Sequence, residues 1–116
     1  MSAPDLNHVT LSGRLARSPV LETLASGHVV CSMVVACHYR QRDDLTGAWR
    51  EFTDYVPVRA FGFQARTAKD GLRRGSLVSV VGRVASRRLA EGDEDDGRWV
   101  LEVIAQAVQF AGGRRS

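Results

Sequence analysis

The stretch TDYVPVRAFGFQA, residues 53–65, contains side chains suited to binding flat, charged molecules. If it is extended, alternation places Tyr55, Arg59 and Phe61 on one side of the strand. The other side is aliphatic, with Val56, Val58 and Ala60. Aromatic rings and guanidinium groups both stack on planar rings, and guanidinium also pairs with phosphate. The stretch therefore predicts a strand with a core on its aliphatic side and a stacking surface on the other.

The charge distribution favours a polyanionic partner. Five of the 13 acidic side chains lie in the segment EGDEDD, 91–96, so the rest of the chain has 16 basic and 8 acidic side chains, a net charge of +8. All basic residues except Lys69 are arginine. Arginine suits nucleic acid because it binds phosphate in a bidentate way, although a bias toward arginine codons is the alternative explanation of the ratio. The positive excess itself indicates a nucleic-acid partner.

Apolar residues recur mostly at every second position, which predicts an all-β protein. The expected strands are 8–15, 20–24, 28–39, 49–61, 76–88 and 98–110. A helical spacing of Phe61, Ala65, Ala68 and Leu72 interrupts them. Pro57 indicates a sheet edge or a bulge, and Gly13 a bulge or a close backbone approach. This order predicts a five-stranded Greek-key barrel of the OB type, with one short helix and two long hairpin loops. The pattern alone also allows a sandwich.

The length of 116 residues predicts one domain with a single modest core. We expect a flexible N-terminal arm at 1–6, the OB-fold domain at 7–111 and a frayed basic end at 112–116. No apolar run reaches the roughly 18 residues of a membrane span, and no signal-peptide pattern opens the chain. The expected location is therefore the cytoplasm, with no membrane partner.

Cysteine and histidine residues do not form a metal-binding pattern. Cys31 and Cys37 lie six residues apart in an apolar run, a spacing that fits neither a metal site nor a redox motif. We expect buried, reduced thiols, with an inter-subunit disulfide or a regulatory thiol as alternatives. His38 follows Cys37, but no second pair of ligands accompanies them, so neither a metal nor a cofactor is expected.

Three segments resemble the bacterial single-stranded DNA-binding protein family. NHVTLSGRLARSP (7–19) resembles the family's opening strand, and TDYVPVRAFG (53–62) its strand with a Thr-acid-aromatic start and an aromatic-Gly end. LRRGSLVSVVGRVASR (72–87) resembles its helix end and following strand. The three segments occur in the family's order and spacing and cover residues 7 to about 110.

The resemblance implies an OB fold, a homotetramer, sequence-tolerant binding of single-stranded DNA and no catalysis. It places the chain in the cytoplasm, associated with the nucleoid, in DNA replication, recombination or repair. Members that recruit other proteins carry an acidic tail, whereas this chain ends in Gly112-Gly113-Arg114-Arg115-Ser116. A tailless paralogue and a truncated form both fit that end. Tail-mediated recruitment of replication and repair proteins is not expected from these residues.

The resemblance also suggests which residues bind DNA. The family's four base-stacking positions fall on Gln41, Tyr55, Phe61 and Leu89, of which two are aromatic here. Tyr39 and Trp49 lie near the first long loop and are candidates to replace Gln41. The matching basic positions are Arg50, Arg74, Arg87 and Arg88, and the strand alternation adds Arg59.

Several of these residues have alternative interpretations. Trp49 and Trp99 each suit packing or a subunit interface. Arg87 and Arg88 point to opposite sides of a strand, so one of them is a candidate for a solvated charge. The acidic segment 91–96 repels DNA and is excluded from the binding path.

Two other functions stay open at this stage. One is an oligomeric OB-fold scaffold with weakened DNA binding, and the other is RNA binding. An enzyme is not expected, because the sequence contains no catalytic triad or dyad with plausible spacing and no phosphate-binding loop.

Overall fold

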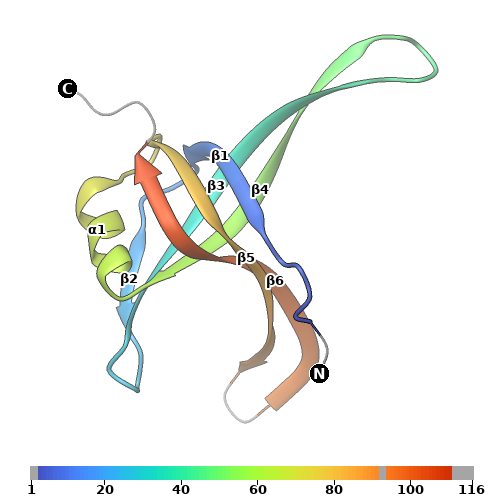
Figure 1. Ribbon diagram of the computed structural model, residues 1–116. Helices are drawn as coiled ribbons and strands as arrows, with labels where there is room; N and C mark the ends of the chain where they lie inside the picture. Colours follow the sequence, from blue (N-terminus) through green and yellow to red (C-terminus); the bar gives the residue numbers. More distant parts are fainter. Residues whose placement is uncertain (1–2, 92–93, 111–116) are drawn as a thin grey trace.

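The computed structural model describes residues 3–91 and 94–110, which form six strands and one helix (Figure 1). The strands carry the apolar alternation seen in the sequence, and the helix lies between the fourth and fifth of them. In chain order the elements are β1 (Val9–Leu15), β2 (Val20–Thr23), β3 (Val29–Arg42), β4 (Trp49–Phe61), α1 (Phe63–Gly71), β5 (Leu77–Glu91) and β6 (Glu94–Phe110).

The strands close into a barrel. They are hydrogen-bonded in the order β1-β5-β6-β4-β3-β2, and β1 also pairs with β3 through Arg14↔Ala36 and Leu15↔Val35. β2 pairs with β3 as well, next to β1 along that strand, with Val20 opposite Ser32. β1 and β2 together therefore occupy one place in the closed sheet. The predicted five-stranded barrel with one short helix is confirmed, and the sandwich alternative is wrong.

The barrel core is aliphatic. Met33, Val35, Val58, Val78 and Val80 have at most 1% of their surface exposed. Burying one such side chain contributes about 1.5–3 kcal/mol to folding. The predicted close approach at Gly13 is also present, because a Cβ atom there would collide with the carbonyl oxygen of Ala36 on β3. The inward side chains Val58 and Ala60 of β4 are therefore in the core, as the aliphatic side of the stretch 53–65 predicts.

Two hairpins extend well beyond the barrel (Figure 1). The β3–β4 hairpin rises to the upper right of the view, and the β5–β6 hairpin lies below the barrel. β3 runs to Arg42 rather than ending near Tyr39, and β5 and β6 pair as far as Glu91↔Glu94. The sequence prediction ended these strands too early because their outer parts are polar. Backbone pairing across a hairpin needs no apolar alternation.

Helix α1 covers one end of the barrel. It starts after Gly62, whose φ of 63° lies in the left-handed region that favours glycine. Ala65, Ala68 and Leu72 are buried against the core, as their spacing predicts, whereas Phe61 belongs to β4. Across the described residues, no helix has the length and apolar character needed to cross a membrane. The predicted basic end at 112–116 lies outside the described residues.

Candidate nucleic-acid interface

The outward side of β4 exposes aromatic side chains. Tyr55 has 66% of its surface exposed and Phe61 39%, whereas Val58 and Ala60 on the inward side are fully buried. An aromatic side chain is normally buried, because it has a large apolar surface. The arrangement follows directly from strand alternation, as the sequence predicts. The two rings are therefore available to a ligand.

Arg59 lies between these rings in sequence and contacts one of them. Its guanidinium carbon is 5.3 Å from the centre of the Phe61 ring, within the range of a cation–π contact. Its Nε atom is 3.4 Å from Oε2 of Glu102 on β6, and its side chain is 21% exposed. The parallel pairing Arg59↔Ile104 brings these two strands together. Arg59 thus extends the flat surface of Phe61.

Glu102 links Arg59 to Arg87 and was missed by the sequence analysis. Its side chain is only 3% exposed, and its Oε1 atom accepts a hydrogen bond of 2.5 Å from Nε of Arg87 on β5. A buried carboxylate is costly unless it is paired. The signal available in the sequence was a single acid inside the apolar run WVLEVIAQAV, 99–108. The barrel brings together the predicted residues Arg59, Phe61 and Arg87.

The β3–β4 hairpin has two distinct sides. Directly paired residues of antiparallel strands share a side. Trp49 lies on the same side as Tyr55 by alternation along β4, and the guanidinium carbon of Arg40 is 5.2 Å from its ring centre. Trp49 is 59% exposed, so within this chain it does not pack in the core. The outward surface of β4 therefore continues along one side of the hairpin.

The other side of this hairpin contains Tyr39 and Arg50. Tyr39 is paired with Phe52, and their rings stack with centres 5.3 Å apart and an angle of 21° between planes. Gln41 is paired with Arg50 on that same side. Phe52 was also missed, because the register that sets it opposite Tyr39 differs from the one expected from a loop tip at Thr46-Gly47, which would place Asp54 there. Tyr39 and Arg50 therefore lie on the opposite side of the hairpin from Tyr55.

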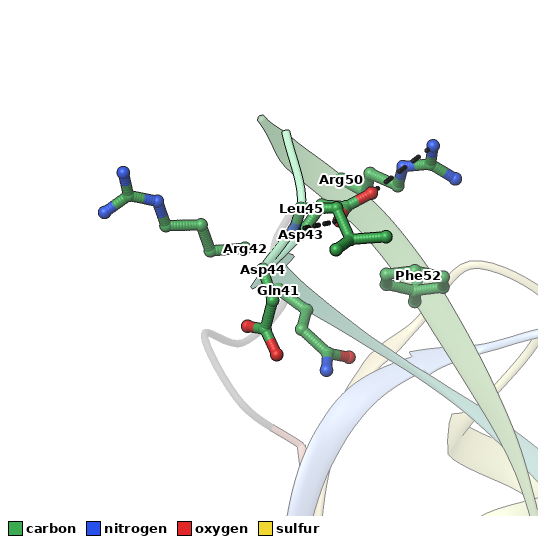
Figure 2. Close-up of a pocket in the computed structure, with 7 residues that line it drawn as sticks. All are labelled: Gln41, Arg42, Asp43, Asp44, Leu45, Arg50 and Phe52. Atoms are coloured by element: carbon green, nitrogen blue, oxygen red, sulfur yellow. Dashed lines mark hydrogen bonds and ion pairs between the residues drawn. The ribbon is translucent and has the colours of Figure 1, made fainter. Parts of the chain in front are cut away.

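A shallow pocket of about 400 Å³ lies at the end of this hairpin (Figure 2). Its lining includes Gln41, Arg42, Asp43, Asp44, Leu45, Arg50 and Phe52. Arg42 and Arg50 point to opposite sides of the hairpin in this view, and Arg50 pairs with Asp43 at 3.7 Å. The Arg50 side chain is 65% exposed, so solvent screens this pair and the guanidinium can exchange Asp43 for another anion.

Arg74 and Arg88 lie apart from the cluster around Glu102. Arg88 is adjacent to Arg87 and faces the opposite side of β5, where its guanidinium carbon is 5.4 Å from the ring centre of Trp99. Arg74 lies in the turn between α1 and β5, and its backbone N–H donates to Oγ of Ser18 at 3.3 Å. Trp99 is 59% exposed in this chain, so, like Trp49, it does not pack in the core of the single chain.

Comparison with known proteins identifies the family. Residues 6–111 match the single-strand binding protein family. The chain belongs to this family. A relative in Chlorobaculum tepidum, described as single-stranded DNA-binding protein 2, is 34% identical over 113 residues, which is 97% of this chain and 75% of the relative. The resemblance found in the sequence is therefore confirmed.

Solved structures show the same fold. A Plasmodium falciparum SSB in complex with ssDNA superimposes with a TM-score of 0.83, at 23% identity over 95% of this chain and 98% of that one. A deletion mutant of the single-stranded DNA-binding protein from Thermus aquaticus gives a TM-score of 0.80 at 29% identity. It covers 94% of this chain, which spans 52% of that protein. The OB-type barrel predicted from the sequence is thus confirmed.

The two cysteines of this family member are free thiols. Cys31 is fully buried, and Cys37 is partly buried and donates its thiol hydrogen to the carbonyl oxygen of Ser12 at 3.4 Å. Burial raises the pKa of both thiols above the ordinary value of 9.0, and the nearby carboxylate of Asp54 raises the pKa of Cys37 further. In residues 3–91 and 94–110, no three His, Cys, Asp or Glu side chains are grouped as metal ligands.

These pKa shifts predict slow alkylation of the folded protein. A raised pKa keeps each thiol protonated near pH 8, and only the thiolate reacts. Iodoacetamide should therefore label Cys37 more slowly in the folded protein than in urea, with the rate rising only at pH values above 9.0. Cys31 should react more slowly still, because it is inaccessible. Peptide mass spectrometry measures both rates, and labelling of folded Cys37 at pH 7 as fast as in urea would contradict the assignment.

Proposed function

We propose that this protein binds single-stranded DNA without sequence preference and protects it during replication, recombination or repair. The observation that carries the proposal is the exposed pair Tyr55 and Phe61 on the outward side of β4, extended by Arg59. Bases of any sequence stack on such rings, because every base presents a flat π face. No bond is made or broken, so the protein acts by binding alone.

Electrostatic attraction supplies the second part of the mechanism. Arg50 and Arg87 are at least half exposed and contact phosphates, and Arg74 and Arg88 extend the positive surface beyond the stacking rings. Trp49 continues the stacking surface along the β3–β4 hairpin, and Tyr39 provides a further ring on its other side. Single-stranded DNA then crosses β4 and follows the hairpin. The acidic segment 91–96 stays outside this path.

Assembly and location complete the proposal. We infer that the protein forms a homotetramer in the cytoplasm, associated with the nucleoid. Exposed apolar side chains on β2 and β6 support self-association, since Val20 is 49% and Leu101 65% exposed in the single chain. These side chains are available to be covered by another subunit.

A binding competition tests the proposed function. Fluorescence anisotropy of a labelled oligo(dT) is measured at several salt concentrations, with an unlabelled duplex of equal length and poly(U) as competitors. We expect oligo(dT) to bind tightly, the duplex to compete poorly, and log K to fall linearly with log salt, by about 0.7 per phosphate contact. Equal affinity for duplex DNA would contradict the proposal. Stronger competition by poly(U) would favour the RNA-binding alternative, and an absence of binding would favour a scaffold.

A further inference from the structure

The cluster of Arg59, Arg87 and Glu102 assigns different roles to two arginines that look equivalent in the sequence. Glu102 lies on β6, between β4 and β5, and has 3% of its side chain exposed. Its Oε1 atom accepts a hydrogen bond from Nε of Arg87 at 2.5 Å, and its Oε2 atom lies 3.4 Å from Nε of Arg59, an ion-pair contact without a hydrogen bond. One buried negative charge is therefore shared by two positive charges.

The two arginines differ in how much they can reach solvent. The Arg87 side chain is 51% exposed, so a large part of its guanidinium is available to a phosphate. The Arg59 side chain is 21% exposed, and its guanidinium lies over the Phe61 ring. Holding a guanidinium against a ring removes part of it from water, and a nearby anion offsets this desolvation cost. Glu102 provides that anion.

We propose that Glu102 is a positioning residue that holds Arg59 flat on Phe61, so that Arg59 acts as a base-stacking surface and not as a phosphate contact. The inference rests on the proposed binding of single-stranded DNA and goes beyond it, by dividing the basic residues into two classes. Arg50 and Arg87 release counterions when DNA binds. Arg59 releases none, because its guanidinium is largely covered by the protein and lies over the Phe61 ring, out of reach of phosphate.

The salt dependence of binding separates these classes. Neutralising a phosphate contact reduces the slope of log K against log salt by about 0.7, whereas removing a stacking group weakens binding at all salt concentrations and leaves the slope unchanged. Arg50→Gln should therefore flatten the slope by about 0.7. Arg59→Gln should lower affinity about fivefold with the slope of the wild-type protein.

The variant Glu102→Gln tests the positioning role itself. The amide keeps the shape of the carboxylate and removes its charge, which frees Arg59 to leave the ring and contact phosphate. We expect a slope steeper by about 0.7 and weaker binding at high salt, where stacking carries most of the affinity. Glu22→Gln, an exposed carboxylate on β2, is the matched control for charge. Because Glu102 is buried, thermal unfolding is measured for each variant, and Arg59→Gln decides the question if Glu102→Gln does not fold.

The outcomes distinguish this inference from the proposed function. If the wild-type protein does not bind oligo(dT), the proposed function fails. If the wild type binds and Arg59→Gln flattens the slope as much as Arg50→Gln, Arg59 is an ordinary phosphate contact and the inference is wrong. A Glu102→Gln variant that folds and binds with the wild-type slope, or with the same change as Glu22→Gln, would also overturn it.

Discussion

Replacing both Tyr55 and Phe61 with alanine should weaken binding of oligo(dT) by at least about 30-fold. Stacking of a base on an aromatic side chain is worth about 1–3 kcal/mol, so two lost rings cost at least about 2 kcal/mol. The loss of Phe61 also removes the ring on which Arg59 lies. Few other rings can compensate, because Gln41 and Leu89 stand at two of the positions where the resemblance to the family implies aromatic residues.

The effect of this double substitution can be separated from misfolding. Both rings lie on the outward side of β4 and leave the core row at Val58 and Ala60 unchanged, so thermal unfolding should shift little. Phe63→Ala is the matched control, since this ring is 83% exposed at the start of α1 and outside the proposed path. Anisotropy measures all variants. Unchanged affinity in the double variant would remove the stacking mechanism and favour the scaffold alternative.

Gly82→Ala should destabilise the barrel by about 3 kcal/mol. Gly82 on β5 pairs with Val9 on β1 and with Ala105 on β6, next to an irregularity in the β5–β6 register. A Cβ atom there would overlap the carbonyl oxygen of Ile104, which is backbone and cannot rotate away. Relief requires the strands to separate where β5 joins both neighbours, and overpacking of this kind typically costs 1–3 kcal/mol or more.

Thermal or urea denaturation measures this loss. A change of about 3 kcal/mol lowers the Tm by roughly 10–20 °C in a domain of this size. Arg83→Ala is the control. Arg83 is the next residue on β5, and its side chain is exposed, so its replacement leaves the core unchanged. A Gly82→Ala protein with the Tm of the wild type would show that the strands accommodate the methyl group and that the close approach is not required.

The sequence predicts the half-buried parts of this fold well. β4 runs from Trp49 to Phe61, as the alternation indicates, because one side of it must be apolar to face the core. The same reasoning places Tyr55 and Phe61 outward. The ends of β3 and β5 were predicted less well, since polar residues in a two-stranded hairpin pair through the backbone and leave no apolar pattern.

The cluster around Glu102 could not be predicted from local pattern. Arg59 and Glu102 meet because β4 and β6 lie side by side and parallel, and the register between them is set by closure of the whole barrel. A single acid in an apolar strand indicates a buried ion pair, but not its partners. Phe52 is a similar case, because it lies opposite Tyr39 only in the observed hairpin register, and counting back from the expected tip at Thr46-Gly47 places Asp54 there instead.

The path of the DNA across β4 is the central claim, and photo-cross-linking tests it most directly. Oligo(dT) carrying 5-iododeoxyuridine is bound to the wild-type protein and irradiated, and the linked peptides are identified by mass spectrometry. We expect cross-links at Tyr55 and Phe61, with further links at Trp49 on the same side of the hairpin. Cross-links confined to Phe63 or Trp99, with none on β4, would contradict it.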